Sequence, residues 1–209
     1  MAGRVFTIAQ QKGGAGKTTL AIQLAVAWHL AGKRVATVDI DPQGSLTEWH
    51  KARTEALGDP GITHAQITGW RTQREVERLA RDHDVVVVDS PPHAETEARI
   101  AVRVADLVVV PVQPSPMDLW ATRPTLDMAK AEKRRVLLVL NRVPPRAKLA
   151  DQLAEKVGEL GVELAATQVG NRIGFAAAMM EGRAIQETDR RSRGAEEIDE
   201  LAAEILGRV

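Results

Sequence analysis

The sequence predicts an α/β fold in which one doubly wound, mostly parallel sheet carries helices on both faces. Apolar runs of strand length alternate with segments of helical spacing along the chain, which is the pattern of βαβ units. Residues 84–89 contain four consecutive valines without polar alternation, and this indicates a strand buried on both faces of a parallel sheet. No linker, repeat or low-complexity tract interrupts the 209 residues. We therefore expect one domain over residues 1–209.

The first half of the chain opens with a strand over 5–9, a helix over 16–30 and a second strand over 34–39. The helix stops at Ala31-Gly32, and a glycine is a common residue just after a helix. A strand, a helix and a strand at this spacing predict a right-handed parallel unit. Further patterns predict a weak edge strand over 62–67, the valine strand over 84–89, and helices over 45–57, 73–81 and 95–104.

The second half continues the alternation, with strands over 107–112 and 135–140 and a weaker strand over 162–168. A helix is predicted over 117–132 between the first two of these strands. Before the last strand, four apolar residues at helical spacing predict another helix. Two more helices are expected over 175–181 and 195–206. The four apolar residues are Leu149, Leu153, Val157 and Leu160.

The composition excludes several classes of protein. Lysine plus arginine and aspartate plus glutamate both total 28, so the net charge alone indicates neither a nucleic-acid nor a membrane partner. The chain has no cysteine, which excludes disulfides, cysteine-ligated metals and iron–sulfur clusters. The five histidines show no metal-binding spacing. No signal-like segment or run of membrane-spanning length is present, so we expect a soluble cytoplasmic protein.

Residues 11–19 form a glycine-rich turn between the first strand and the first helix, Gln-Lys-Gly-Gly-Ala-Gly-Lys-Thr-Thr. Glycines let backbone N–H groups point at a polyanion, and the helix that follows adds its positive N-terminal end. Lys17 can neutralise phosphate oxygens, and the hydroxyl of Thr18 can ligate Mg²⁺. Gln11 departs from the general phosphate-loop pattern, which has glycine there. The predicted nucleotide-binding residues of this turn are Lys12, Gly13, Gly14, Ala15, Gly16, Lys17, Thr18 and Thr19.

Polar side chains stand where predicted strands end, at Asp39 and Asp41, at Asp89 and at Asn141. Ligands of doubly wound sheets bind beyond the carboxyl ends of the strands, so these residues belong to the same edge as the glycine-rich turn. Each of them alone could equally be a turn residue. Their convergence predicts a single nucleotide site.

The run Lys-Gly-Gly-x-Gly-Lys-Thr-Thr at residues 12–19 resembles the deviant Walker motif of the ParA/MinD ATPases, a branch of the P-loop NTPases. The resemblance covers nearly the whole chain and implies hydrolysis of ATP with Mg²⁺. In that family the early lysine, here Lys12, reaches across a dimer interface to the nucleotide of the partner. The resemblance thus gives Lys12 a role that the general phosphate-loop pattern lacks.

The same resemblance implies roles at the strand ends. Residues 39–43 resemble a switch I segment, in which Asp41 orients the attacking water and Asp39 lies near the metal. Asp89 resembles a Walker B aspartate, which holds Mg²⁺ through a water. Asn141 matches the position that reads the adenine. The implied catalytic residues are Lys12, Lys17 and Asp41, and the implied metal site comprises Thr18, Asp39 and Asp89.

Residues 111–118 resemble the switch II segment of the family. Asp118 at its end has two interpretations of similar weight, as a residue of the dimer interface or as a residue of the first turn of a helix.

The resemblance further implies an ATP-dependent homodimer that binds DNA without sequence preference, and a ParB-like or cargo-adaptor partner that stimulates hydrolysis. A neutral protein can bind phosphates when its positive charge gathers on one face. The chain starts at the first strand, so we expect no N-terminal DNA-reading extension, and a nucleoid-associated protein that positions a plasmid or a cellular cargo. The candidate DNA contacts are Arg146, Lys148, Arg172, Arg183, Arg191 and Arg193.

Two other functions fit the same fold. A MinD-like positioning ATPase would act on a membrane surface, but a membrane-targeting tail is basic and amphipathic, whereas residues 195–209 are rich in glutamate. A metabolic ATP-dependent ligase, similar to dethiobiotin synthetase, would need a small-molecule pocket beside the γ-phosphate. The sequence offers no candidate residues for such a pocket.

Overall fold

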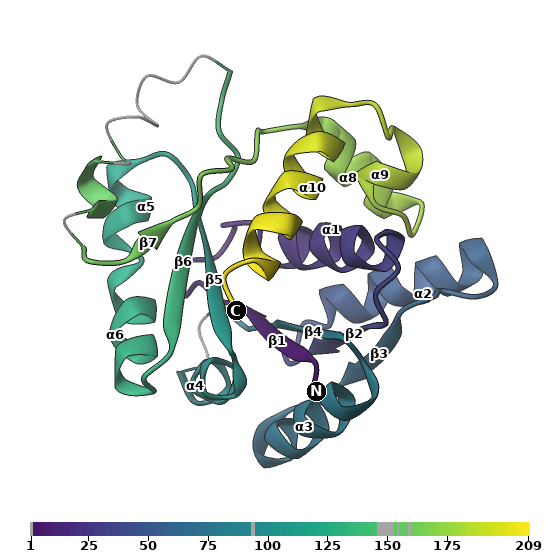
Figure 1. Ribbon diagram of the computed structural model, residues 1–209, viewed down its shortest axis with the longest axis horizontal. Helices are drawn as coiled ribbons and strands as arrows, with labels where there is room; N and C mark the ends of the chain where they lie inside the picture. Colours follow the sequence, from purple (N-terminus) through teal and green to yellow (C-terminus); the bar gives the residue numbers. More distant parts are fainter. Residues whose placement is uncertain (1, 93–94, 146–152, 154, 159) are drawn as a thin grey trace.

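A seven-stranded sheet organises the computed structural model, which describes residues 2–92, 95–145, 153, 155–158 and 160–209. The strand order is β3-β2-β4-β1-β5-β6-β7, and every pairing between these strands is parallel (Figure 1). β2 and β3 lie on one side of β1, and β5, β6 and β7 lie on the other. The predicted doubly wound α/β architecture is therefore confirmed.

The central strands are buried throughout because they carry few polar side chains. β2, β4 and β5 are buried at every position, as the apolar runs predicted. β3 is the most exposed of the longer strands and lies at one edge of the sheet, as expected. The strands are β1 (Arg4–Ile8), β2 (Val35–Asp39), β3 (Thr63–Gln66), β4 (Val85–Asp89), β5 (Leu107–Val112), β6 (Arg135–Leu140) and β7 (Glu163–Leu164).

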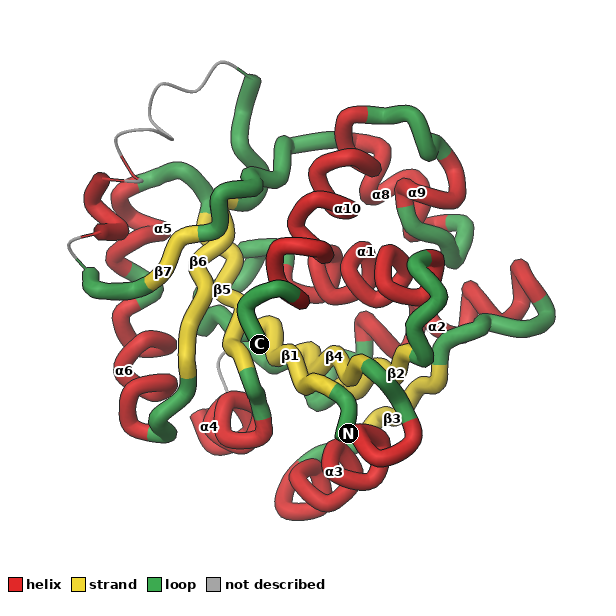
Figure 2. The backbone as a smooth tube through the Cα atoms, in the orientation of Figure 1, coloured by secondary structure: helices red, strands yellow, loops and turns green. Residues whose placement is uncertain are grey.

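Helices cover both faces of the sheet, and Figure 2 shows the strands as one layer between them. One core packs α1, α2, α8, α9 and α10 against the sheet, and α3, α4, α5 and α6 contribute to the cores of the opposite face. The helices are α1 (Lys17–Leu30), α2 (Ser45–Leu57), α3 (Thr72–Asp82), α4 (Glu95–Val104), α5 (Pro116–Trp120), α6 (Arg123–Ala131), α8 (Ile173–Met180), α9 (Ile185–Thr188) and α10 (Arg193–Leu206), with a short 3-10 helix at Gly69–Arg71.

Two predicted elements differ in the structure. The single helix predicted over 117–132 is two helices, α5 and α6, because Pro124 at the start of α6 cannot donate a backbone N–H to the preceding turn. The strand predicted over 162–168 is only Glu163–Leu164, since β7 pairs at the edge of the sheet with β6 alone. Arg146, Lys148 and Leu149 lie outside the described residues.

None of the helices in the described part of the chain combines the length and the apolar content that crossing a membrane requires.

Candidate nucleotide site

The glycine-rich turn lies between the end of β1 and the start of α1. Gly14 and Gly16 have φ angles of 77° and 88°, a region that L-residues with a Cβ rarely adopt. A Cβ on Gly16 would lie 2.6 Å from Asn141 Nδ2, so a larger residue there would have to displace the side chain of Asn141. Two side chains hold the turn from outside: Asn141 donates to Ala15 O at 2.9 Å and Gln113 donates to Gly14 O at 3.0 Å. The backbone therefore forms a cradle at the N-terminus of a fourteen-residue helix.

Lys17 and Thr18 open this helix and face the strand ends. Lys17 is buried, and that burial lowers the pKa of its ammonium, while the nearby Asp89 and Asp41 carboxylates oppose the shift. Thr18 Oγ1 donates to Asp89 Oδ2 at 2.6 Å. These contacts join the glycine-rich turn to β4 across the sheet edge.

Asp89 is buried with an unsatisfied oxygen. Its side chain is 1% exposed, and its Oδ1 has no hydrogen-bond partner among the described residues. Burial raises the pKa of Asp89 to about 7, against the opposing effect of the hydrogen bond from Thr18. A cation at this oxygen would remove that penalty, and carboxylate and hydroxyl oxygens are the ligands that Mg²⁺ prefers. Asp89 and Thr18 thus fit a magnesium site.

Asp39 is the last residue of β2, and Asp41 lies on the loop that follows. Asp39 is fully buried, and its two oxygens accept three hydrogen bonds: from the N–H of Asp41 at 3.1 Å, and from the N–H and Oγ1 of Thr47 at 2.9 and 2.8 Å. Asp41 is half-buried, and its Oδ1 accepts the N–H of Gln43 at 2.9 Å. The structure therefore ties Asp39 to the loop and leaves Asp41 nearer the solvent.

Lys12 does not point into its own turn. Its Nζ lies 2.8 Å from Asp118 Oδ1, and the side chains are 38% and 10% exposed. Asp118 belongs to the first turn of α5, where Ser115 is the N-cap and accepts the N–H of Asp118 at 3.1 Å. Asp118 thus lies in a first helical turn, as one interpretation expected, and its carboxylate also binds the lysine of the phosphate loop, while a role in a dimer interface stays a prediction.

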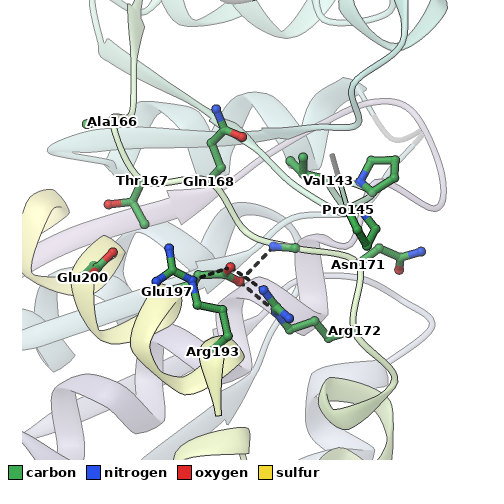
Figure 3. Close-up of a pocket in the computed structure, with 12 residues that line it drawn as sticks. Val143, Pro145, Ala166, Thr167, Gln168, Asn171, Arg172, Arg193, Glu197 and Glu200 are labelled. Atoms are coloured by element: carbon green, nitrogen blue, oxygen red, sulfur yellow. Dashed lines mark hydrogen bonds and ion pairs between the residues drawn. The ribbon is translucent and has the colours of Figure 1, made fainter. Parts of the chain in front are cut away.

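The candidate DNA-binding arginines differ in their exposure and in their ion pairs. Arg172 donates to Glu197 through Nε at 2.9 Å and Nη2 at 2.5 Å, and Arg193 lies 3.4 Å from the same carboxylate (Figure 3). Glu197 also accepts the N–H of Gly170 at 3.0 Å. These residues line a hollow of about 610 Å³ beside the loop after β6. Arg191 is exposed, without an ion pair among the described residues, and Arg183 is half-buried.

Sequence reasoning missed three residues that shape this edge. Gln113 holds the phosphate loop, Thr47 holds Asp39, and His64 contacts Thr47 at 3.0 Å. Gln113 lies in the segment that resembles switch II, but the resemblance gave it no role, and Thr47 and His64 belong to no motif. Their side chains reach the site only because the loops and strands are folded together. The order of the strands would have been needed to find them.

Comparison with known proteins finds a matching family model and similar sequences. Residues 6–185 match the family model described as "CobQ/CobB/MinD/ParA nucleotide binding domain". The maintenance of carboxysome distribution protein A of Halothiobacillus neapolitanus is 30% identical, with 97% of each chain covered. The chromosome-partitioning ATPase Soj of Thermus thermophilus is also 30% identical, with 99% of this chain and 96% of Soj covered.

Solved structures share the fold. The McdA–ATP complex from Cyanothece has a TM-score of 0.80 at 17% identity, covering 99% of this chain and 97% of McdA. The septum site-determining protein MinD with Mg-ADP from Pyrococcus horikoshii has a TM-score of 0.77 at 20% identity, covering 97% and 95%. At these identities the likeness shows the fold and not a shared cargo.

Proposed function

This chain belongs to the CobQ/CobB/MinD/ParA family of nucleotide-binding domains and is an ATPase that uses ATP and Mg²⁺, and we propose that it acts as a dimerising switch. In its ATP state it binds DNA without sequence preference and positions a plasmid or a cellular cargo. A ParB-like or cargo-adaptor partner stimulates hydrolysis and so releases the protein from DNA.

Each residue of the site has its own role in the proposed hydrolysis of ATP. The backbone of residues 13–17 cradles the phosphates, Lys17 neutralises their oxygens, and Thr18 with Asp89 holds the metal. When bound, Mg²⁺ supplies charge neutralisation on the phosphate that is transferred. Asp41 orients the attacking water from the loop after β2. Asn141 lies against the phosphate loop, where it can also reach the base.

The single observation that carries the proposal is the separation of the two lysines. Lys17 is buried within its own turn, whereas Lys12 is partly exposed and is bound by Asp118 on α5. One lysine per chain is therefore available to a nucleotide outside that chain. This supports a dimer in which each Lys12 serves the nucleotide of the other copy.

The surface around Lys12 fits a second copy. Met117 and Trp120 flank Asp118 on α5 and are 71% and 67% exposed. Exposed large apolar side chains are typical of interaction sites, and tryptophan is enriched among the residues that dominate binding energy. α5 thus offers apolar anchors beside the lysine that must cross the interface.

Exposed arginines at and just before the start of α10 support DNA binding. Arg190, Arg191 and Arg193 stand close together in sequence, and all three are exposed. The name of Soj from Thermus thermophilus connects that relative with chromosome partitioning. We propose the exposed arginines of this segment as the main phosphate contacts, with Arg172 and Arg183 as further candidates.

The cargo has a second candidate. The Halothiobacillus relative is named for carboxysome distribution, so a protein assembly is an alternative to a plasmid. The membrane-surface alternative is disfavoured by the glutamates of α10, of which Glu204 binds Arg208 at 2.6 Å. If the protein were a metabolic ligase, its use of ATP would depend on the presence of a small-molecule acceptor substrate.

The proposal is tested by binding of a fluorescent random-sequence duplex with ATP, with ADP or without nucleotide, at two salt concentrations. Binding that requires ATP, weakens with salt and persists longer in Asp41→Ala supports the switch. Binding that is equal in all nucleotide states would contradict it. Liposome co-sedimentation in parallel tests the membrane alternative.

A further inference from the structure

The hydroxyl of Thr47 joins a carboxylate of the nucleotide edge to a histidine of the outer strand. Thr47 Oγ1 donates to Asp39 Oδ2 at 2.8 Å, and His64 Nε2 lies 3.0 Å from the same hydroxyl. His64 Nδ1 lies 2.9 Å from Thr37 Oγ1. We call this row of hydrogen bonds the Asp39–Thr47–His64–Thr37 relay. It lies beside the loop that carries Asp41.

The carboxylate sets the direction of donation along the relay. Asp39 can only accept, so Thr47 gives its single hydroxyl proton to Asp39 and must accept from His64. The proton of the neutral ring is therefore on Nε2, and Nδ1 accepts from Thr37. Burial, together with the stacked ring of His50, lowers the pKa of His64 to about 4, so the ring is neutral at pH 7. Asp39, Thr47 and His64 then have one defined orientation each, and the hydroxyl of Thr37, which also lies 3.4 Å from Thr63 O, donates to the nearer Nδ1 of His64.

Asp39 takes the place of a helix cap for α2. The N-cap residue of α2 is Gly44, which has no side chain to accept an N–H of the first turn. The N–H of Thr47 donates instead to Asp39 Oδ2 at 2.9 Å, and a carboxylate at a helix N-terminus is favourable. The other oxygen of Asp39 accepts the N–H of Asp41 at 3.1 Å. One carboxylate thus fixes both ends of the loop over 40–44.

We propose that Thr47 and His64 are positioning residues for ATP hydrolysis, because through Asp39 they hold the backbone of Asp41 where its side chain can orient the attacking water. In this proposal Asp39 acts through the loop, because its two oxygens accept three hydrogen bonds from Asp41 and Thr47. The inference rests on the proposed role of Asp41 and is independent of DNA binding.

The test compares variants that differ only in the relay. Thr47→Val removes the hydroxyl at nearly constant shape, and Thr47→Ser restores it. Thr54→Val is the matched control, because it removes a hydroxyl from the same helix that bonds only to His50 O, at 2.9 Å. His64→Leu removes the outer donor. For each variant we measure single-turnover hydrolysis at saturating Mg·ATP, the Kd of a fluorescent ATP analogue, and hydrogen exchange of the Asp41 amide without nucleotide.

We expect Thr47→Val to lower the hydrolysis rate about tenfold, with a nucleotide Kd within about twofold of the parent. The Asp41 amide should exchange at least about tenfold faster, since it loses an ordered acceptor. Thr47→Ser and Thr54→Val should match the parent in all three measurements, and His64→Leu should lower the rate by about two- to fivefold.

A Thr47→Val rate within about twofold of the parent would overturn the proposal. A parallel loss of rate and nucleotide affinity would also overturn it, because a merely structural role predicts that result. An unchanged rate in His64→Leu would overturn the assignment of His64. Asp41→Ala is measured alongside, since undiminished hydrolysis there would refute the role of Asp41 on its own.

Discussion

The ammonium of Lys12 lies 2.8 Å from the carboxylate of Asp118, so the lysine of the phosphate loop is bound to α5 of its own chain. Asp118 in turn accepts the hydroxyl of Ser115, the N-cap of α5, at 2.5 Å. In the proposed dimer Lys12 must leave this carboxylate to reach the nucleotide of the other copy. The pair therefore couples the phosphate loop to the exposed apolar side chains of α5.

Lys12→Ala should separate nucleotide binding from hydrolysis. Lys12 does not contribute to its own cradle, so the Kd for a fluorescent ATP analogue should stay within about threefold of the parent, while hydrolysis falls at least about tenfold. Lys17→Ala is the matched control and should lose nucleotide binding itself. Isothermal titration and phosphate release measure the two properties. Retained hydrolysis in Lys12→Ala would contradict the role across the interface.

Asp118→Asn should favour the dimer. The exchange keeps the backbone cap from Ser115 but removes the charge that binds Lys12, and such a partly exposed pair is worth about 0.5–1 kcal/mol. Because each copy breaks one such pair when the dimer forms, the dissociation constant of the ATP-dependent dimer should fall by about 5- to 30-fold. Analytical ultracentrifugation with an ATP analogue measures it. A weaker dimer would mean that Asp118 itself contacts the second copy.

Gly16→Ala should abolish nucleotide binding, because a Cβ at this residue would lie 2.6 Å from Asn141 Nδ2 at a φ angle of 88°. Gly32→Ala is the control: its φ angle is 79°, but no heavy atom lies within 4 Å of the added Cβ. Both changes should cost about 1–2 kcal/mol of stability through the left-handed backbone. Urea unfolding and nucleotide titration distinguish the two. Equal nucleotide affinity in both variants would refute a role for the crowding at Gly16.

Much of the fold follows from local patterns. The strand β4 and the end of α1 depend on residues that are adjacent in sequence, namely the valine run and Gly32. The sequence alone therefore predicts both. The break between α5 and α6 was missed although Pro124 marks it, because the apolar spacing continues across the proline. The extent of β7 could not be predicted, because the length of an edge strand depends on how many residues of the neighbouring strand, here β6, pair with it.

The phosphate loop could also be predicted from local sequence, because glycines close together in the chain determine its backbone conformation. Contacts between segments that are far apart in the sequence could not be predicted. The pairing of Lys12 with Asp118 and of Arg172 with Glu197 depends on which loops meet at the strand ends. A charged residue in a sequence shows no partner, and so the sequence alone does not distinguish Arg172 from Arg191 among the candidate DNA contacts.

Arg191→Ala and Arg172→Ala should therefore affect DNA binding differently. Arg191 is exposed, without an ion pair in the described part of the chain, so its loss should weaken binding and lower the salt slope by about 1 without changing stability. Arg172→Ala leaves the buried Glu197 without its main partner and should cost about 1–2 kcal/mol of stability. Fluorescence anisotropy and thermal unfolding measure the two effects. An unchanged melting temperature in Arg172→Ala would show that the ion pair contributes little.

His64 predicts a pH dependence of stability. Its pKa is lowered to about 4 in the folded protein, whereas an unfolded histidine titrates near 6.5. Above about pH 6.5 neither state is protonated at this ring and the stability is complete. As the pH falls from about 6.5 toward 4, His64 is protonated in the unfolded state but stays neutral in the folded state. The free energy of unfolding therefore decreases.

His64→Gln removes this titration and keeps a side-chain N–H that can donate to Thr47. Between pH 7 and pH 5 the parent should lose about 1 kcal/mol more stability than the variant, because a shift of one pKa unit corresponds to about 1.4 kcal/mol and the ring is only partly buried. Urea unfolding of both proteins at the two pH values measures the difference. The carboxylates that also titrate in this range are common to both proteins and cancel. Equal losses in the two proteins would mean that the folded and unfolded states protonate His64 alike, so that burial does not lower the pKa of this ring.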